Sequence, residues 1–101
     1  MGRTGKLFNY QWSKIKPDIL AIAKGIGGGF PLGAVLLDKK VSSAMTPGSH
    51  GSTFGGNPLG MAVADAVLNY VVKEDFLDHV RFVGYNLRKK LNIKKKILLL
   101  L

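Results

Sequence analysis

The apolar run at residues 19–23, with the sequence Ile-Leu-Ala-Ile-Ala, ends directly on Lys24. It has the length of a strand and shows no alternation of polar and apolar side chains, which predicts a strand buried on both faces, as in a parallel sheet. Four of the five residues after Lys24 are glycine, and glycine allows sharp turns that other residues resist. A second apolar run at residues 34–37 predicts another buried strand. The pattern therefore predicts a lysine held in a tight turn between two strands.

Two helices are predicted in the second half of the chain. Asn57 followed by Pro58 is typical of a helix start, with a capping side chain and a proline at the first helical position. A second, amphipathic helix is predicted from Phe76 to about Leu91. Together with the strands, these helices predict an α/β fold. We expect the first helix to be largely buried, because apolar residues form two adjoining faces: Leu59, Ala62, Ala66 and Tyr70 on one, and Val63, Val67 and Val71 on the other. Residues 39–45 are predicted to form one or two helical turns, and residues 49–57 a loop.

Positive charge is concentrated near the end of the chain. The sequence has 15 basic and 6 acidic residues, a net charge of +9, and six of the basic residues lie between Arg88 and Lys96. This segment leaves open a small basic module that binds nucleic acid or an anionic membrane surface. It lacks the interleaved aromatic residues typical of nucleic-acid binding, so a solvated helix end is the favoured interpretation.

Composition excludes several other kinds of site. The chain has no cysteine, which excludes disulfides and thiolate metal sites, and its two histidines disfavour a histidine metal site. Its longest apolar run is far shorter than the roughly 20 residues that span a bilayer, and no secretory signal pattern opens the sequence. We therefore expect a cytoplasmic chain with neither a metal, a membrane nor a nucleic acid as partner. The aromatic residues Phe8, Tyr10 and Trp12 are expected to pack a short strand and turn rather than to stack on a ligand.

Lys24 is the residue with the strongest chemical potential. Burial of its amino group would lower its pKa and make it a nucleophile that forms a Schiff base with a carbonyl group. The neighbouring glycines would admit a flat ring, and Ser52 and Thr53, within Gly-Ser-Thr-Phe-Gly-Gly, offer hydroxyl and N–H groups to a phosphate. The alternative, favoured on spacing alone, is a solvated lysine that ends a strand before a glycine turn.

Four ordered segments, at residues 2–8, 17–19, 23–34 and 50–58, resemble the class III aminotransferases, which are pyridoxal-phosphate enzymes of fold type I. The resemblance covers residues 1–91 and is greatest to enzymes that act on N-acetylornithine in arginine biosynthesis. Enzymes for ornithine, succinylornithine and 4-aminobutyrate share much of the pattern. The resemblance implies part of a large domain with three α/β/α layers.

The same resemblance implies roles for individual residues. Lys24 matches the lysine that binds pyridoxal 5′-phosphate covalently and moves the proton during transfer. Thr53 matches a threonine that binds the cofactor phosphate in the neighbouring subunit of a homodimer, and Ser52 matches a substrate-binding position. The implied reaction transfers the amino group of N-acetylornithine to 2-oxoglutarate.

The resemblance also implies that parts of the family's site are missing. The aspartate that pairs with the pyridine nitrogen would precede Met1, and Asp18 would lie at the far end of the Lys24 strand. We therefore expect a fragment of a PLP-binding large domain at residues 1–91 that is inactive alone and exposes apolar faces. Residues 92–101 depart from the family pattern and are predicted to form a low-complexity tail. The competing interpretation is a noncatalytic remnant with a basic, anion-binding tail.

Overall fold

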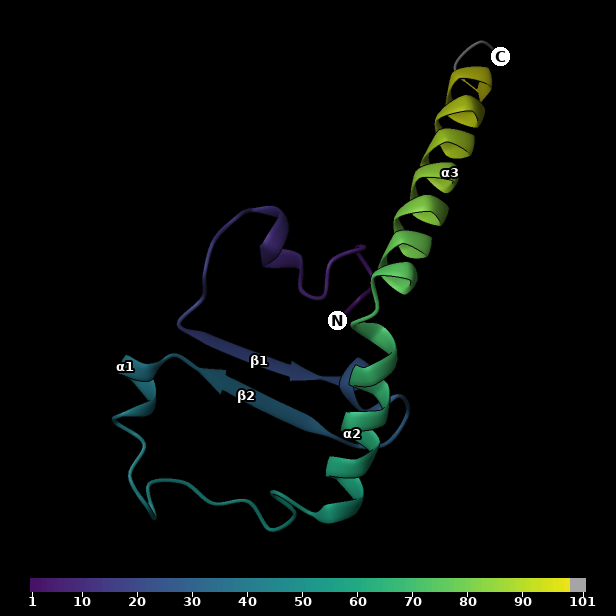
Figure 1. Cartoon of the computed structure of the whole chain (residues 1–101). Helices are drawn as coiled ribbons and strands as arrows, with labels where there is room; N and C mark the ends of the chain where they lie inside the picture. Colours follow the sequence, from purple (N-terminus) through teal and green to yellow (C-terminus); the bar gives the residue numbers. More distant parts are fainter. Residues whose placement is uncertain (99–101) are drawn as a thin grey trace.

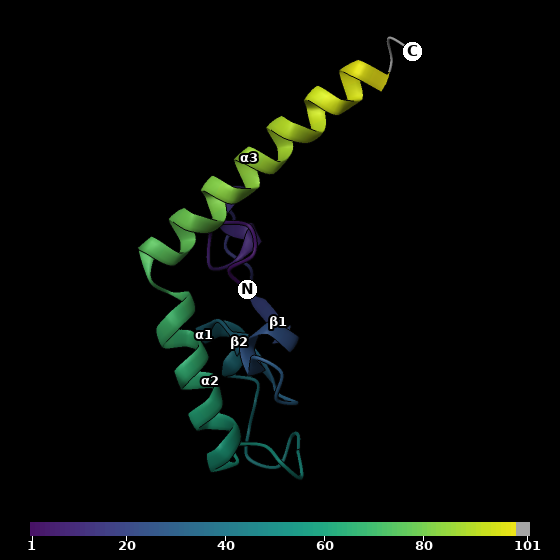
Figure 2. The ribbon, with the colours of Figure 1, turned by 90° about the vertical axis from the view of Figure 1, so that its right-hand side faces the viewer.

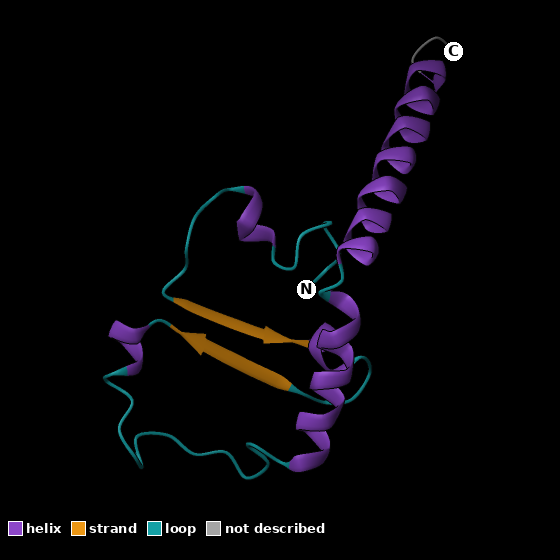
Figure 3. Ribbon diagram, in the orientation of Figure 1, coloured by secondary structure: helices purple, strands orange, loops and turns teal. Residues whose placement is uncertain are grey.

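The computed structural model describes residues 1–98, with side chains described through residue 92. Two 3₁₀ helices and two strands alternate in the first part of the chain and three α-helices follow. Helix α2 runs beside the end of the sheet where β1 finishes and β2 begins (Figures 1 and 3). This mixed content confirms the coarse α/β prediction. The elements, with η for a 3₁₀ helix, are η1 (Asn9–Trp12), β1 (Ile19–Ala23), η2 (Lys24–Gly27), β2 (Gly33–Leu37), α1 (Lys39–Ser42), α2 (Pro58–Val71) and α3 (Glu74–Leu98).

The two strands lie where the apolar runs predict them, but they pair antiparallel. The register places Ile19 opposite Leu37 and Ala23 opposite Gly33. The prediction of strands buried on both faces is wrong for the described chain, since exposed and half-buried residues alternate along β1. Ile19 is 56% exposed and Val35 is 62% exposed. An apolar run without alternation fits two-sided burial, yet residues 1–98 supply a helix to one face of the sheet only.

Helix α2 begins as the sequence predicts. The Asn57 side chain accepts a hydrogen bond of 2.7 Å from the Gly60 N–H, and Pro58 is the first helical residue. One of its two apolar faces, formed by Val63, Val67 and Val71, is half-buried. The prediction that the helix is largely buried is wrong for the other face, whose members Leu59, Ala62, Ala66 and Tyr70 are all exposed.

Helix α3 projects away from the rest of the chain (Figures 1 and 2). The molecule therefore measures 63 × 29 × 26 Å, and its radius of gyration is 18.5 Å, against about 13 Å for a compact chain of this length. The helix starts close to the predicted position but continues to Leu98, beyond the predicted end near Leu91. The predicted tail at residues 92–101 thus begins inside α3, and residues 99–101 lie outside the described part.

The remaining segments are short. Helix α1 spans one turn of the predicted 39–45 stretch and is capped by Asp38, whose side chain accepts from the Val41 N–H at 2.8 Å. Residues 49–57 form turns and irregular structure, as predicted. The aromatic residues near the N-terminus form a 3₁₀ turn instead of a strand, with Phe8 and Tyr10 stacked at 5.7 Å between ring centroids. Across the described residues, no helix is long and apolar enough to cross a membrane.

The core of the described chain is small. Three apolar side chains are buried among residues 1–92: Ile26, Ala64 and Leu77. An apolar groove of 410 Å³ lies between the sheet and α2, with Ile22 and Ala34 from the strands and Met61 and Leu68 from the helix among its lining. The expectation that this chain exposes apolar faces is confirmed.

Replacing Asn57 with alanine should destabilise the chain by about 1 kcal/mol, the typical loss for a helix N-cap. The reason is that the Gly60 N–H loses its acceptor. The free energy of unfolding, measured by urea titration with far-UV circular dichroism, checks the prediction. Asn69→Ala is the matched control, because Asn69 lies inside α2 and is exposed. Equal losses in the two variants would show that the cap contributes nothing.

Candidate functional site

Lys24 occupies an uncommon backbone conformation at the end of β1. It is the first residue of η2, and its φ of 54° places it in the left-handed region. Only one other non-glycine residue with positive φ occurs among residues 1–98, Lys14. The left-handed region costs an ordinary residue about 1–2 kcal/mol. Such strained residues cluster at functional sites, where the surrounding structure maintains them.

The glycine turn after Lys24 is anchored on α2. Ile26 and Gly27 are buried, and Gly28 has a φ of +56°. A Cβ atom on Gly28 would lie 2.8 Å from Val67 Cγ2, so the backbone approaches the helix more closely than a side chain allows. This packing fixes the turn and with it the position of the Lys24 backbone.

The Lys24 side chain itself is exposed. Within the described part of the chain, its amino group forms neither an ion pair nor a hydrogen bond. The structure therefore matches the solvated alternative rather than a lysine desolvated by its own chain. An exposed, unpaired primary amine is accessible to a carbonyl compound in solution.

Ser52 and Thr53 lie in the loop that leads into α2. Both are exposed. The loop is tied together by hydrogen bonds from the Gly55 N–H to the Ser52 carbonyl at 3.3 Å and from Asn57 Nδ2 to the Phe54 carbonyl at 2.8 Å. The residue that caps α2 thus also holds the turn that carries the two hydroxyl groups.

The structure does not bring Lys24 and Thr53 into one cavity. The turn after Lys24 meets α2 at Val67, whereas Thr53 precedes Pro58 at the start of the helix. Between Pro58 and Val67 the helix rises about 14 Å. Neither Lys24 nor Thr53 lines the cavities described for residues 1–98. The roles predicted for Lys24, Ser52 and Thr53 stay predictions.

The chemistry of these groups fits pyridoxal phosphate in part. Lys24 offers an amine to its aldehyde, and the Ser52–Thr53 turn offers hydroxyl groups to its phosphate. A carboxylate for the ring nitrogen is lacking near Lys24, because Asp18 precedes β1 and Lys24 follows it, about 20 Å away along an extended chain. Asp38 lies at the same far end, where its N–H donates to the Asp18 carbonyl at 2.9 Å.

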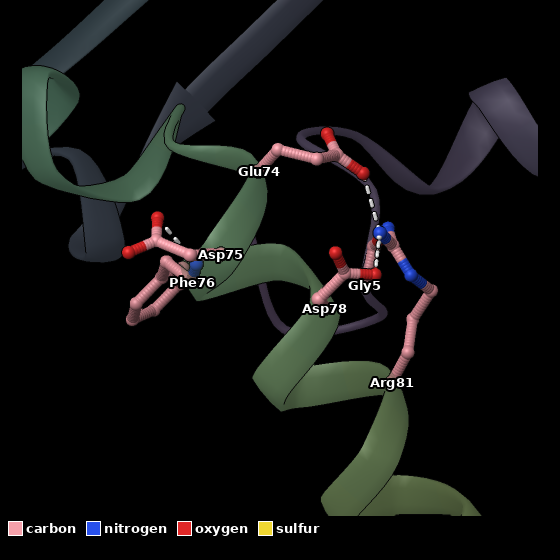
Figure 4. A network of polar contacts seen from close by, with 6 residues as sticks. All are labelled: Gly5, Glu74, Asp75, Phe76, Asp78 and Arg81. Atoms are coloured by element: carbon pink, nitrogen blue, oxygen red, sulfur yellow. Dashed lines mark hydrogen bonds and ion pairs between the residues drawn. The ribbon is translucent and has the colours of Figure 1, made fainter.

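A polar cluster around Arg81, which the sequence analysis did not predict, joins the N-terminal turn to the first half of α3 (Figure 4). Arg81 donates from Nη1 to the Gly5 carbonyl, and its Nη2 forms ion pairs with Glu74 and Asp78. The hydrogen bonds to the carboxylates of Asp78 and, next, Glu74 raise the pKa of Arg81. The spacing of Glu74, Asp78 and Arg81 on one helix was a visible signal. No pattern in the sequence indicated the contact with Gly5, which lies 76 residues away.

Comparisons with known proteins give one consistent result. The family described as "Aminotransferase class-III" matches residues 1–97. An acetylornithine aminotransferase of Brucella melitensis is 58% identical over 81 residues, which are 80% of this chain and 20% of that protein. The acetylornithine aminotransferase of Bacillus subtilis is 48% identical over 96 residues, 95% of this chain and 25% of that protein.

A solved structure of Plasmodium falciparum ornithine delta-aminotransferase has a similar fold. It superposes with a TM-score of 0.84 at 34% identity, over 94% of this chain and 24% of that one. The chain thus spans a fifth to a quarter of the length of the curated relatives named here.

Proposed function

This chain belongs to the class III aminotransferases, and from that premise we propose that it forms the lysine-bearing part of an enzyme that transfers the amino group of N-acetylornithine to 2-oxoglutarate. The observation that carries the proposal is Lys24, exposed and left-handed at the end of β1, in a chain 48–58% identical to acetylornithine aminotransferases. The proposed cofactor is pyridoxal 5′-phosphate, which when bound supplies an electron sink for the reacting carbon.

Lys24 carries the covalent and proton-transfer work in this proposal. Its backbone is fixed by the glycine turn packed on Val67, while its amino group has no partner in the described part of the chain and can hold or move a proton at Nζ. Thr53 would bind the phosphate through its hydroxyl group and Ser52 would contact the substrate. Thr53 precedes the start of α2, whereas the turn after Lys24 meets α2 at Val67, about 14 Å further along the helix. We therefore propose that Thr53 serves the site of a second subunit in a homodimer.

The rest of the architecture is proposed on the same basis. The exposed outer face of the sheet and the exposed face of α2 are the surfaces that further layers of a three-layer α/β/α domain would cover. A TM-score of 0.84 to part of a much longer chain supports this arrangement.

Ornithine is the second candidate amino donor. The specific observation in its favour is the structural match to ornithine delta-aminotransferase over 94% of this chain. The higher identity to acetylornithine aminotransferases, 58% against 34%, favours the acetylated donor.

Borohydride trapping tests the assignment of Lys24. The chain is incubated with pyridoxal phosphate and reduced, which fixes the cofactor on whichever lysine holds it, and the labelled peptides are mapped. We expect label on Lys24 in preference to the other lysines, because in the proposed homodimer Thr53 would bind the cofactor phosphate and hold its aldehyde at this lysine. Loss of one charged hydrogen bond in Thr53→Ala should reduce that label about tenfold.

Thr46→Ala is the matched control, since Thr46 is an exposed threonine in the same connection between α1 and α2. It should leave the labelling of Lys24 unchanged. Label spread evenly over Lys24, Lys89 and Lys90 would contradict the proposal and favour a noncatalytic remnant.

A further inference from the structure

A cavity of 690 Å³ lies apart from Lys24, between the N-terminal segment, η1 and the first half of α3. Figures 1 and 2 both show the N-terminal segment beside the start of α3. Three of the residues that line the cavity are arginines and three others are polar or aromatic: Arg3, Arg81 and Arg88, with Thr4, Asn9 and Trp12. We call this space the arginine cavity.

The positive charge of the arginine cavity is only partly neutralised by the protein. Arg81 is paired with Glu74 and Asp78. Arg3 and Arg88 are exposed, and within the described part of the chain neither has an ion pair or a side-chain hydrogen bond. Among the described residues, two arginines without acidic partners therefore line one cavity, and opposite charge on a ligand would attract it there.

One wall of the arginine cavity is fixed in advance. Arg81 is held by the Gly5 carbonyl and two carboxylates, so its guanidinium has a single orientation. Trp12 is held by a hydrogen bond of 3.2 Å from Nε1 to the Thr4 carbonyl, and Lys6 Nζ lies 5.4 Å from its ring centroid. Such preorganisation lowers the entropy that a ligand loses on binding.

The origin of the two unpaired arginines indicates the kind of ligand. Arg3 belongs to the N-terminal segment and Arg88 to α3, so each of the two segments that border the cavity contributes one of them. A guanidinium binds a carboxylate through two parallel hydrogen bonds. Val80 and Leu87 add apolar lining to the same cavity. A molecule with two carboxylates on an apolar body fits this lining better than a single compact anion.

We propose that the arginine cavity binds a small dicarboxylate, with one carboxylate on Arg88 and the other on Arg3, and with its apolar body against Trp12 and Leu87. The site is distinct from the residues proposed for catalysis, because Lys24, Ser52 and Thr53 do not line it. The inference rests on the geometry of this cavity and holds whichever amino donor the enzyme uses.

Fluorescence of Trp12 tests the proposal directly, because Trp12 is the only tryptophan of the chain. The full chain is titrated with adipate, and separately with inorganic phosphate, while sodium chloride keeps the ionic strength constant. We expect a saturable change with adipate and at least about tenfold weaker binding of phosphate. Arg88→Gln should weaken adipate binding about tenfold, as expected for the loss of one charge-assisted contact.

Lys89→Gln is the matched control, since it removes the same charge from the next residue, which is exposed and does not line the cavity. It should leave adipate binding within about twofold. Arg3→Gln provides a second variant, and circular dichroism shows whether each variant retains its helices. No saturable change with adipate, equal effects of Arg88→Gln and Lys89→Gln, or phosphate binding as tight as adipate would each overturn the proposal.

Discussion

The 101-residue chain on its own should transaminate N-acetylornithine and 2-oxoglutarate at least about 10³-fold more slowly than the full-length acetylornithine aminotransferase of Bacillus subtilis. A rate loss of about 10³-fold is the upper end of what the removal of one charge-stabilising group costs an enzyme. Transamination builds negative charge that must be stabilised, and the cofactor does this best when a carboxylate faces its ring nitrogen. In this chain the carboxylates of Asp18 and Asp38 lie at the opposite end of β1 from Lys24. Its other four acidic residues lie on α2 and in α3: Asp65, Glu74, Asp75 and Asp78.

The measurement is the steady-state formation of glutamate with both substrates and saturating pyridoxal phosphate. Lys24→Ala supplies the baseline, because it removes the amine that the reaction requires. Selective labelling of Lys24 together with absent turnover is the expected combination, since labelling needs the amine and the proposed phosphate contact of Thr53, whereas turnover also needs a carboxylate at the ring nitrogen. Turnover within about tenfold of the full-length enzyme would contradict the argument and would require a carboxylate that the described residues do not place near Lys24.

Local signals in the sequence predicted several elements correctly. The strand at Ile19–Ala23, the glycine turn after Lys24 and the start of α2 at Asn57–Pro58 all depend on residues within a few positions of one another. The Asn57 cap is a bond across three residues. Such features form wherever the chain carries them, so the position of the candidate lysine at the end of a strand could be derived before any coordinates.

Burial and strand pairing were not predictable in the same way. The apolar run of β1 is equally compatible with a parallel and an antiparallel partner, because direction is decided by the path of the chain between the strands. The two apolar faces of α2 are equivalent in sequence, yet only the face with Val63 and Val67 is half-buried, and Val67 meets the glycine turn. Which face is covered depends on contacts between distant segments.

The backbone of Lys24 is a further feature that sequence reasoning missed. A residue with a left-handed backbone conformation is usually glycine, asparagine or aspartate, for which that conformation costs less free energy. Nothing in the identity of a lysine signals a φ of 54°. The conformation results from tertiary structure, since the turn that follows is held against Val67. A strained lysine in this position is consistent with a site that the surrounding structure maintains.

The largest effect on stability should come from Gly5→Ala, which we expect to lower the free energy of unfolding by about 2–4 kcal/mol, from left-handed strain and overpacking together. Gly5 is buried with a φ of +81°, and a Cβ atom on it would overlap Arg81 Cγ. The overlap displaces Arg81 from the Gly5 carbonyl. The hydrogen bond that ties the N-terminal turn to α3 is then lost. Urea unfolding followed by circular dichroism measures the loss.

Gly48→Ala separates the two causes. Gly48 has almost the same φ, +82°, but its Cβ would meet nothing within 4 Å, so this variant reports backbone strain alone. Gly5→Ala should cost at least about 1 kcal/mol more, the lower end for overpacking. In an Arg81→Ala background the obstructing Cγ is gone, and the cost of Gly5→Ala should fall to that of Gly48→Ala, a coupling that a double-mutant cycle detects. Equal costs for Gly5→Ala and Gly48→Ala in the unmodified background would show that the Gly5–Arg81 contact does not hold α3 against the N-terminal turn.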